Sequence, residues 1–268
     1  MIEALHYEFM RNALLAGLLI SISCGIIGSL VVVNRIVFIS GGIAHAAYGG
    51  IGIAFFLGFS PMLGIIGFSM LIAFVMAGVT LENKQRADTI IGVLWATGMA
   101  LGIILLDLTP GYKTDLMSYL FGSILAVPKS HLWLMALLSV VIMGTVAAFY
   151  KDFLAMSYDE EFARAMGVPV KALYFVLLGL IALAVVMIIQ AVGLILVIAL
   201  LTIPPYIAER RAGSLGVMML ISIVLSAFFS LSGLWFSYTF NLTSGASIIM
   251  VAALFFFLHL IVVRLRSV

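Results

Sequence analysis

Eight apolar stretches of about 20 residues each constrain the fold of this chain more than any other feature. A helix needs about that length to cross the hydrocarbon core of a bilayer. The stretches are continuous rather than alternating, which excludes a transmembrane β-barrel. Hydrophobic residues make up 65% of the chain and charged residues 9%, whereas about a quarter of a soluble domain is charged. The chain is therefore expected to be an all-α polytopic protein of the cell (plasma or inner) membrane, in contact with lipid.

The expected spans are separated by short polar turns, and two shorter apolar pieces accompany them. A long apolar run from Leu173 to Ile203 is expected to break near Gln190 and Gly193, with its second helix ending at Pro204 and Pro205. The eight full spans are Ala13–Val33, Ile36–Leu57, Pro61–Leu81, Thr89–Leu108, His131–Phe149, Leu173 to about Gln190, Leu215–Tyr238 and Ala246–Val263, and the shorter pieces are Asp115–Val127 and Gly193–Pro204.

The distribution of Lys and Arg tests the orientation of these spans, because cytoplasmic loops carry an excess of both. With the amino terminus outside and only the Gly193 piece crossing, ten of the thirteen basic residues face the cytoplasm. With the amino terminus inside and both short pieces crossing, nine of the thirteen do. Both schemes place the carboxyl terminus in the cytoplasm, whereas the side of the amino terminus stays open.

One polar stretch, from Met156 to Pro169, interrupts the apolar pattern and is expected to form a short cytoplasmic helix from Ser157 to Gly167. Ser157 is placed as the N-cap, with Glu160 completing a capping box, and Gly167 is placed as the left-handed residue that ends about three turns. A lipid-lying helix would usually carry more Lys and Arg, so docking on a soluble partner is favoured. The residues expected to make that contact are Ser157, the acids Asp159, Glu160 and Glu161, the apolar Phe162, Ala163 and Met166, and Gly167.

His45 is the most informative ionisable residue, because it falls near the middle of the second span, where such groups are costly. A neutral imidazole is the commonest transition-metal ligand. Small residues around it would let neighbouring helices approach closely, and Tyr48 at i+3 shares its helix face. A histidine that only packs against a neighbouring helix is an equally good interpretation of this spacing.

Several other functions are excluded by what the sequence lacks. It contains no G-x-x-x-x-G-K-[ST] motif, so it does not bind ATP through a P-loop. It contains no H-E-x-x-H motif, and an intramembrane enzyme would need more candidate catalytic groups. Cys24 is the only cysteine, which excludes an internal disulfide, and a net charge of +2 gives no indication of nucleic-acid binding. The chain is expected to be a transport subunit and not an enzyme.

Five motifs in the same order resemble the membrane permease subunits of ABC-type zinc and manganese uptake systems, the ABC-3 family. They are the small-residue segment Gly41–Gly50 that contains His45, the run Asp88–Gly102, the L-F-G-S-I-L stretch Leu120–Leu125, the segment Tyr158–Val168, which resembles the coupling helix of the family, and Val192–Pro205. Each motif is weak alone, and their shared order makes the resemblance specific over most of the chain.

The resemblance implies one transmembrane permease domain, 1–268, that imports a divalent transition metal such as zinc, manganese or iron. It implies a permease homodimer, partner ABC ATPases in the cytoplasm that bind the ATP, and an extracytoplasmic metal-binding protein. No cofactor is expected on this chain, whose cargo is the metal ion, and His45 would lie on the metal pathway. A permease for a metal chelate or vitamin and a stand-alone secondary cation transporter are the alternatives.

Two departures from the family pattern bear on the metal site. The family usually has an aspartate four residues before its motif histidine, where this chain has Gly41. It also often has an Asp-x-Pro-x-Gly connection before the last span, where this chain reads Asn241-Leu242-Thr243-Ser244-Gly245. The first departure leaves one motif ligand, His45, where the family has two.

Overall fold

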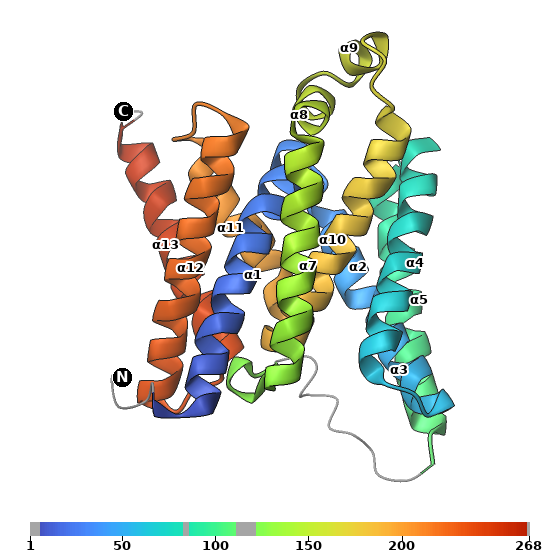
Figure 1. The fold of residues 1–268 in the computed structure, drawn as a ribbon, viewed down its shortest axis with the longest axis vertical. Coiled ribbons are helices and arrows are strands. Elements are labelled where there is room, and N and C mark those ends of the chain that lie inside the picture. Colours follow the sequence, from blue (N-terminus) through green and yellow to red (C-terminus); the bar gives the residue numbers. More distant parts are fainter. Residues whose placement is uncertain (1–5, 83–85, 111–121, 267–268) are drawn as a thin grey trace. The chain divides into compact units, whose positions relative to one another are not determined.

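The computed structural model describes residues 6–82, 86–110 and 122–266, and every regular element in these residues is helical (Figure 1). These helices form two compact units, each assembled from separate stretches of the chain. The first unit comprises Met1–Arg35, Met117–Ala148 and Met187–Val268, and the second comprises Ile36–Leu116 and Phe149–Val186. The expectation of an all-α membrane protein is confirmed.

Eight helical stretches in the described residues are long and apolar enough to cross a membrane, as the sequence predicted. The first unit contains α1 (Glu8–Val33), the 3-10 turn η3 (Ile124–Ala126), α7 (Lys129–Ala148), α11 (Leu194–Glu209), α12 (Leu215–Phe240) and α13 (Ser244–Arg266). The second unit contains α2 (Val37–Ala46), α3 (Tyr48–Leu57), α4 (Pro61–Glu82), α5 (Ala87–Leu108), α8 (Tyr150–Tyr158) and α9 (Glu160–Ala165), and α10 (Val170–Val192) begins in the second unit and ends in the first.

Buried serines hold α1 against α12 in the first unit. The hydroxyl oxygens of Ser29 and Ser222 are hydrogen-bonded at 3.3 Å, and those of Ser21 and Ser230 lie 3.5 Å apart. Lipid is as apolar as leucine, so helices in a membrane associate through close packing and polar contacts rather than through the hydrophobic effect. These pairs also show that α1 and α12 are antiparallel, because the later residue of α1 meets the earlier residue of α12.

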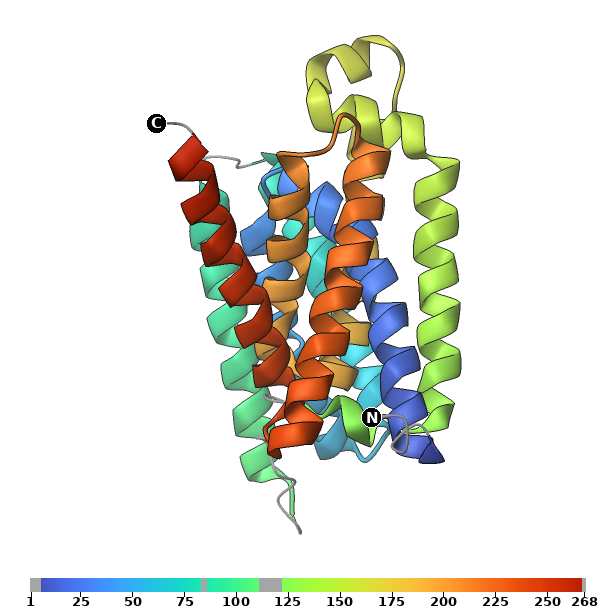
Figure 2. The ribbon, with the colours of Figure 1, turned by 90° about the vertical axis from the view of Figure 1, so that its left-hand side faces the viewer.

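The antiparallel contact places the two ends of the first unit on opposite sides. Figure 2 shows α12 lying between α1 and α13, and the turn after Phe240 makes α13 antiparallel to α12. Helix α13 is therefore parallel to α1, and the start of α1 and the end of α13 face opposite sides. The eight longer spans of the described residues, with the 16-residue α11 beside them, are compatible with ends that face opposite sides. The scheme with the amino terminus outside has its two termini on opposite sides in the same way, and its assignment of sides stays a prediction.

The break expected near Gln190 and Gly193 is confirmed. Gly193 separates α10 from α11 with φ 84° and ψ 174°, a conformation that residues with a Cβ rarely adopt. A Cβ added at Gly122 would lie 2.2 Å from the Gly193 nitrogen, so the segment before η3 touches this break with its backbone. The predicted short helix Asp115–Val127 falls partly on residues 111–121, outside the described residues, and only its end is seen, as η3.

The expected end of α11 at Pro204 and Pro205 is wrong, because the helix continues through both prolines to Glu209. Proline lacks the N–H that would bond the carbonyl four residues earlier, which leaves the Leu201 oxygen without that donor. Gly28 of α1 lies directly against it, since a Cβ added there would be 2.6 Å from the Leu201 oxygen and 2.8 Å from Pro205 Cγ. A glycine on the neighbouring helix thus gives space to the altered backbone.

The second predicted span, Ile36–Leu57, is two helices that meet at Ala47. Helix α3 approaches both of its neighbours at backbone distance. A Cβ added at Gly50 would lie 2.2 Å from the Gly64 oxygen of α4, and one added at Gly52 would lie 2.4 Å from the Gly102 oxygen of α5. The many small residues of this span are therefore needed for close packing.

We expect Gly25→Ala to destabilise the first unit. A Cβ at Gly25 would lie 2.5 Å from the Ile223 nitrogen and 2.7 Å from its Cα, so the backbone of α12 has to move. Overpacking of this kind costs about 1–3 kcal/mol, and thermal unfolding in detergent should show a lower Tm. The matched control is Gly17→Ala on the same helix, where the nearest atoms would be 3.6 Å away and the better helix propensity of alanine should leave Tm unchanged or higher. Equal effects of the two substitutions would contradict the proposed packing.

Candidate functional site

His45 lies in the last turn of α2, and its ring stacks on Trp95 of α5. The two ring centroids are 4.0 Å apart and the planes differ by 11°. The indole nitrogen of Trp95 donates a hydrogen bond to the Met99 sulfur at 3.3 Å, which orients the indole along α5. The sequence analysis did not predict this partner, although Trp95 lies within the Asp88–Gly102 run that carried part of the family resemblance.

One nitrogen of His45 is available for a ligand. Its Nδ1 atom is buried and has no hydrogen-bond partner among the described residues. Buried polar atoms of folded proteins are nearly always paired, and an unpaired one often marks the place of a water or an ion. The ring also packs against the neighbouring helix through Trp95, so both the ligand and the packing interpretation of His45 stay open at this point.

Close packing by small residues holds α2 and α3 against α5 around this histidine. A Cβ added at Gly98 would lie 2.7 Å from Ala46 Cα, and one added at Gly102 would lie 2.4 Å from the Tyr48 oxygen. Tyr48, expected to share a helix face with His45, begins α3 after the break at Ala47 and is 2% exposed. The backbone that follows His45, at Ala46 and Tyr48, is thus held against α5, and the His45 ring stacks on Trp95 of the same helix.

The described residues do not complete a metal site around His45. No group of three or more His, Cys, Asp or Glu side chains that could hold a metal ion occurs among them. Gly41, where the family usually has an aspartate, is buried within α2 and has no side chain to offer. Among the described residues, the arrangement therefore supplies one unpaired imidazole nitrogen at this place.

The second candidate region is the polar segment after α7, where the expected single helix from Ser157 to Gly167 is wrong. Two helices occupy the region, because α8 runs through Ser157 to Tyr158 and α9 begins at Glu160. Ser157 has helical backbone and cannot cap. Asp159 has the extended backbone of an N-cap (φ −150°, ψ 99°), and its Oδ1 accepts the Phe162 N–H at 2.9 Å.

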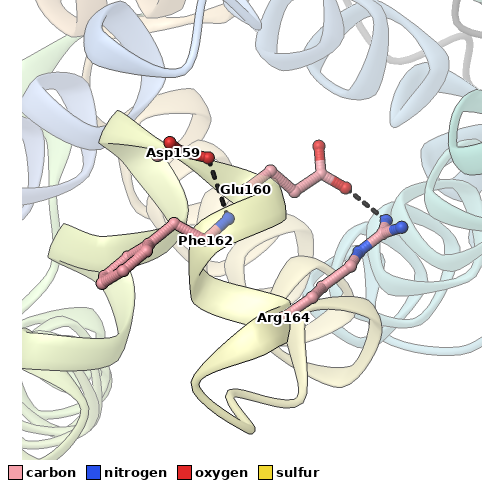
Figure 3. A network of polar contacts seen from close by, with 4 residues as sticks. All are labelled: Asp159, Glu160, Phe162 and Arg164. Carbon is pink, nitrogen blue, oxygen red and sulfur yellow. Dashed lines mark hydrogen bonds and ion pairs between the residues drawn. The ribbon is translucent and has the colours of Figure 1, made fainter.

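A charged pair lies on the polar face of α9 (Figure 3). The carboxylate of Glu160 accepts a hydrogen bond from the Arg164 guanidinium one turn later. Figure 3 shows the Phe162 ring directed away from this pair. Phe162 and Met166 are 58% and 69% exposed, whereas Ala163 is fully buried. The predicted apolar face therefore divides into one buried residue and two large side chains left open.

The end of α9 agrees with the prediction for Gly167. This residue has φ 82°, and no described atom would lie within 4 Å of a Cβ added to it. The Val168 N–H donates to the Ala163 oxygen and the Gly167 N–H to the Arg164 oxygen, both at 3.0 Å. This pair of bonds is the Schellman motif, which satisfies the last carbonyls of a helix and needs a left-handed residue at Gly167.

The corrected cap can be tested by hydrogen exchange at the amide of Phe162. We expect Asp159→Ala to accelerate this exchange, since an N-cap contributes about 0.5–2 kcal/mol, so that protection should fall about twofold to thirtyfold. Asp159→Asn keeps an oxygen in the same place and should preserve most of the protection. Ser157→Ala should leave the Phe162 amide as it is, and an effect there as large as that of Asp159→Ala would restore Ser157 as the cap.

Proteins of known sequence resemble this chain over nearly its whole length. It is 34% identical over 254 residues to the manganese transport system membrane protein MntC of Listeria monocytogenes, which covers 95% of this chain and 90% of the relative. It is 33% identical over 256 residues to the manganese import system permease protein ScaB of Streptococcus gordonii, at 95% and 92% coverage. An uncharacterized membrane protein of Synechocystis is 52% identical over 260 residues, covering 97% and 92%.

Solved structures agree with these sequence matches. The structure of PsaBC from Streptococcus pneumoniae in complex with Fab superposes with a TM-score of 0.87 at 33% identity, covering 96% of this chain and 93% of that chain. An ABC transporter of metal-chelate type in an inward-facing conformation gives a TM-score of 0.73 at 18% identity, with 93% and 85% coverage, and supports the fold alone. Residues 6–263 also match the sequence model of the ABC 3 transport family, and the chain therefore belongs to that family.

Proposed function

We propose that this chain is the membrane permease subunit of an ATP-binding-cassette importer for a divalent transition metal, with manganese as the first candidate. The observation that carries the proposal is the likeness, over about 95% of the chain, to membrane proteins named for manganese transport. Zinc and iron(II) also accept imidazole and oxygen ligands, so the experiment has to compare all three. In this proposal the two compact units act together as one permease domain, 1–268.

His45 is proposed to lie on the metal pathway. Its free Nδ1 and the stacking of its ring on Trp95 support that role, because the ring is held while one nitrogen stays available. A site that an ion only passes must not bind tightly, because conduction requires the ion to leave. One imidazole, with water supplying the other ligands, meets that requirement for a hydrated or partly dehydrated cation.

The energy for import is proposed to come from cytoplasmic ABC ATPases, because this sequence has no P-loop of its own. The carboxyl terminus and the α8–α9 region are proposed to face the cytoplasm, which places ten of the thirteen Lys and Arg there. An extracytoplasmic metal-binding protein would deliver the ion, and a second copy of the permease would complete the pathway.

Helix α9 is proposed to dock on the ATPase. Phe162 of α9 and Met166 at its C-cap are exposed, and the N-cap Asp159 precedes the acids Glu160 and Glu161 of its first turn. An ordered surface of two large apolar side chains beside acids suits a protein groove with a basic edge. Surface ion pairs contribute about 1 kcal/mol or less each, so the apolar contacts would supply most of the affinity.

The other functions considered from the sequence receive less support. A secondary transporter would work without an ATPase, whereas this chain belongs to an ABC transport family. A permease for a metal chelate or vitamin remains compatible with the fold, but the transporter of metal-chelate type is only 18% identical. Manganese-dependent stimulation of ATP hydrolysis in a reconstituted complex would separate free metal from chelate.

The metal pathway is tested with His45→Ala in proteoliposomes that contain the permease, its ATPase and its binding protein. We expect the wild type to import manganese and His45→Ala to abolish this uptake, with assembly and basal ATP hydrolysis largely intact, because the substitution leaves only a small void beside Trp95. The control His259→Ala removes a histidine from α13 and should retain uptake. Zinc and iron(II) are measured in parallel, and normal uptake by His45→Ala would return this residue to a packing role.

The docking of α9 is tested at Gly167. A β-branched residue at a φ of 82° is strained by about 1–3 kcal/mol, so Gly167→Val should misplace the end of α9 and lower the manganese imported per ATP. Gly167→Asn should do less harm, because asparagine tolerates this backbone region. Gly213→Val is a matched control, since it also has open space around it but no positive φ. Normal uptake per ATP in Gly167→Val would remove α9 from the coupling mechanism.

A further inference from the structure

A buried hydroxyl pair joins α10 to α4 in the second unit. The phenolic oxygen of Tyr174 lies 3.1 Å from Thr80 Oγ1. Thr80 Oγ1 also lies 2.6 Å from the Met76 oxygen, to which it donates its only proton. Tyr174 must therefore donate to Thr80, which gives the contact a fixed direction. Thr80 is 4% exposed, so water does not replace this bond easily.

Tyr174 lies near the start of α10, the helix that follows α9 in the chain. It is in the second turn of α10. The Schellman bonds at the end of α9 are followed at once by a bond from the Leu173 N–H to the Pro169 oxygen, at 3.0 Å, which starts α10. Few residues can absorb a displacement between the two helices, so a movement of α9 should reach Tyr174.

Helix α4 extends the contact to the segment that holds His45. Met76, one turn before Thr80, is fully buried, and its Cε would lie 2.9 Å from a Cβ added at Gly42. Gly42 precedes His45 by three residues and so lies on nearly the same face of α2. Helix α4 therefore contacts α10 through Thr80, and it contacts α2 one turn earlier through Met76.

The remaining described contacts between α4 and α10 are apolar. Phe74 and Phe175 have ring centroids 6.2 Å apart, and Gly179 faces Met70 and Phe74 at 3.5 Å from an added Cβ. Apolar contacts of this kind allow small sliding movements between helices, whereas a hydrogen bond is directional and fixes the register of two helices. The hydroxyl pair is therefore the contact that would force α4 to follow α10.

We propose that Tyr174 and Thr80 are positioning residues that transmit the movement of α9 through α4 to the His45 segment of α2. The proposal rests on the proposed function, because it assumes that α9 moves with the ATPase and that His45 meets the metal. It adds a specific polar contact inside the membrane that links the two candidate regions. Neither residue touches the metal in this scheme.

The test measures manganese imported per ATP hydrolysed by the complete complex in proteoliposomes. Tyr174→Phe removes the donor, and Thr80→Val removes the acceptor with little change of shape. We expect each to lower manganese per ATP about threefold to tenfold, the range that corresponds to one hydrogen bond between membrane helices, with the half-saturating manganese concentration unchanged. The double variant should be no worse than the more severe single variant, and Thr80→Ser, which keeps the hydroxyl, should retain coupling.

A purely structural role would give a different pattern. If Tyr174→Phe and Thr80→Val lower Tm, uptake and ATP hydrolysis in proportion, manganese per ATP stays constant and the proposal is overturned. Additive losses in the double variant would overturn it as well, because two members of one contact should not act independently. Failure of the proposed function is recognised separately, since the wild-type complex would then import none of manganese, zinc or iron(II).

Discussion

Helices in this protein must attract one another in a medium that is as apolar as their own side chains. Burial of leucine and isoleucine therefore contributes little to their association in lipid, and the specific contacts are made by backbone approach and by hydroxyl groups. The serines between α1 and α12 and the glycines between α3, α4 and α5 are two solutions to this requirement. In the second unit the same requirement brings backbones together beside His45, and so determines where its ring can point.

The function proposed here separates two tasks within the second unit. One region presents exposed apolar side chains on an ordered turn of helix, and the other holds an imidazole with a free nitrogen among apolar neighbours. Each is simple in chemical terms, and neither contains a group that could drive transport by itself. The energy would come from ATP hydrolysis on partner subunits. The physical requirement on this chain is then that a displacement of α9 reaches the segment of α2 that holds His45.

Much of the fold could be predicted from hydropathy, because the length of an apolar run is set by the thickness of the bilayer. The break at Gly193 was also visible, since a polar Gln190 and a glycine interrupt the longest apolar run. The position of the N-cap of α9 could not be predicted in the same way. Ser157 and Asp159 are both good capping residues, and only the persistence of α8 through Tyr158 decides between them. Trp95 could not be assigned to His45 from one sequence, because 50 residues separate them in the chain.

The prolines of α11 illustrate the limits of local rules and have a mechanical consequence. Pro204 and Pro205 normally end a helix, but Gly28 on α1 accommodates the altered turn. Two carbonyl oxygens, those of Leu200 and Leu201, lose their usual donors within one helical turn. Bending a helix sharply costs hydrogen bonds between its successive turns, and here two such bonds are already missing. The turn of α11 before these prolines is therefore easier to bend than a turn with all its hydrogen bonds, and it can act as a built-in flexure.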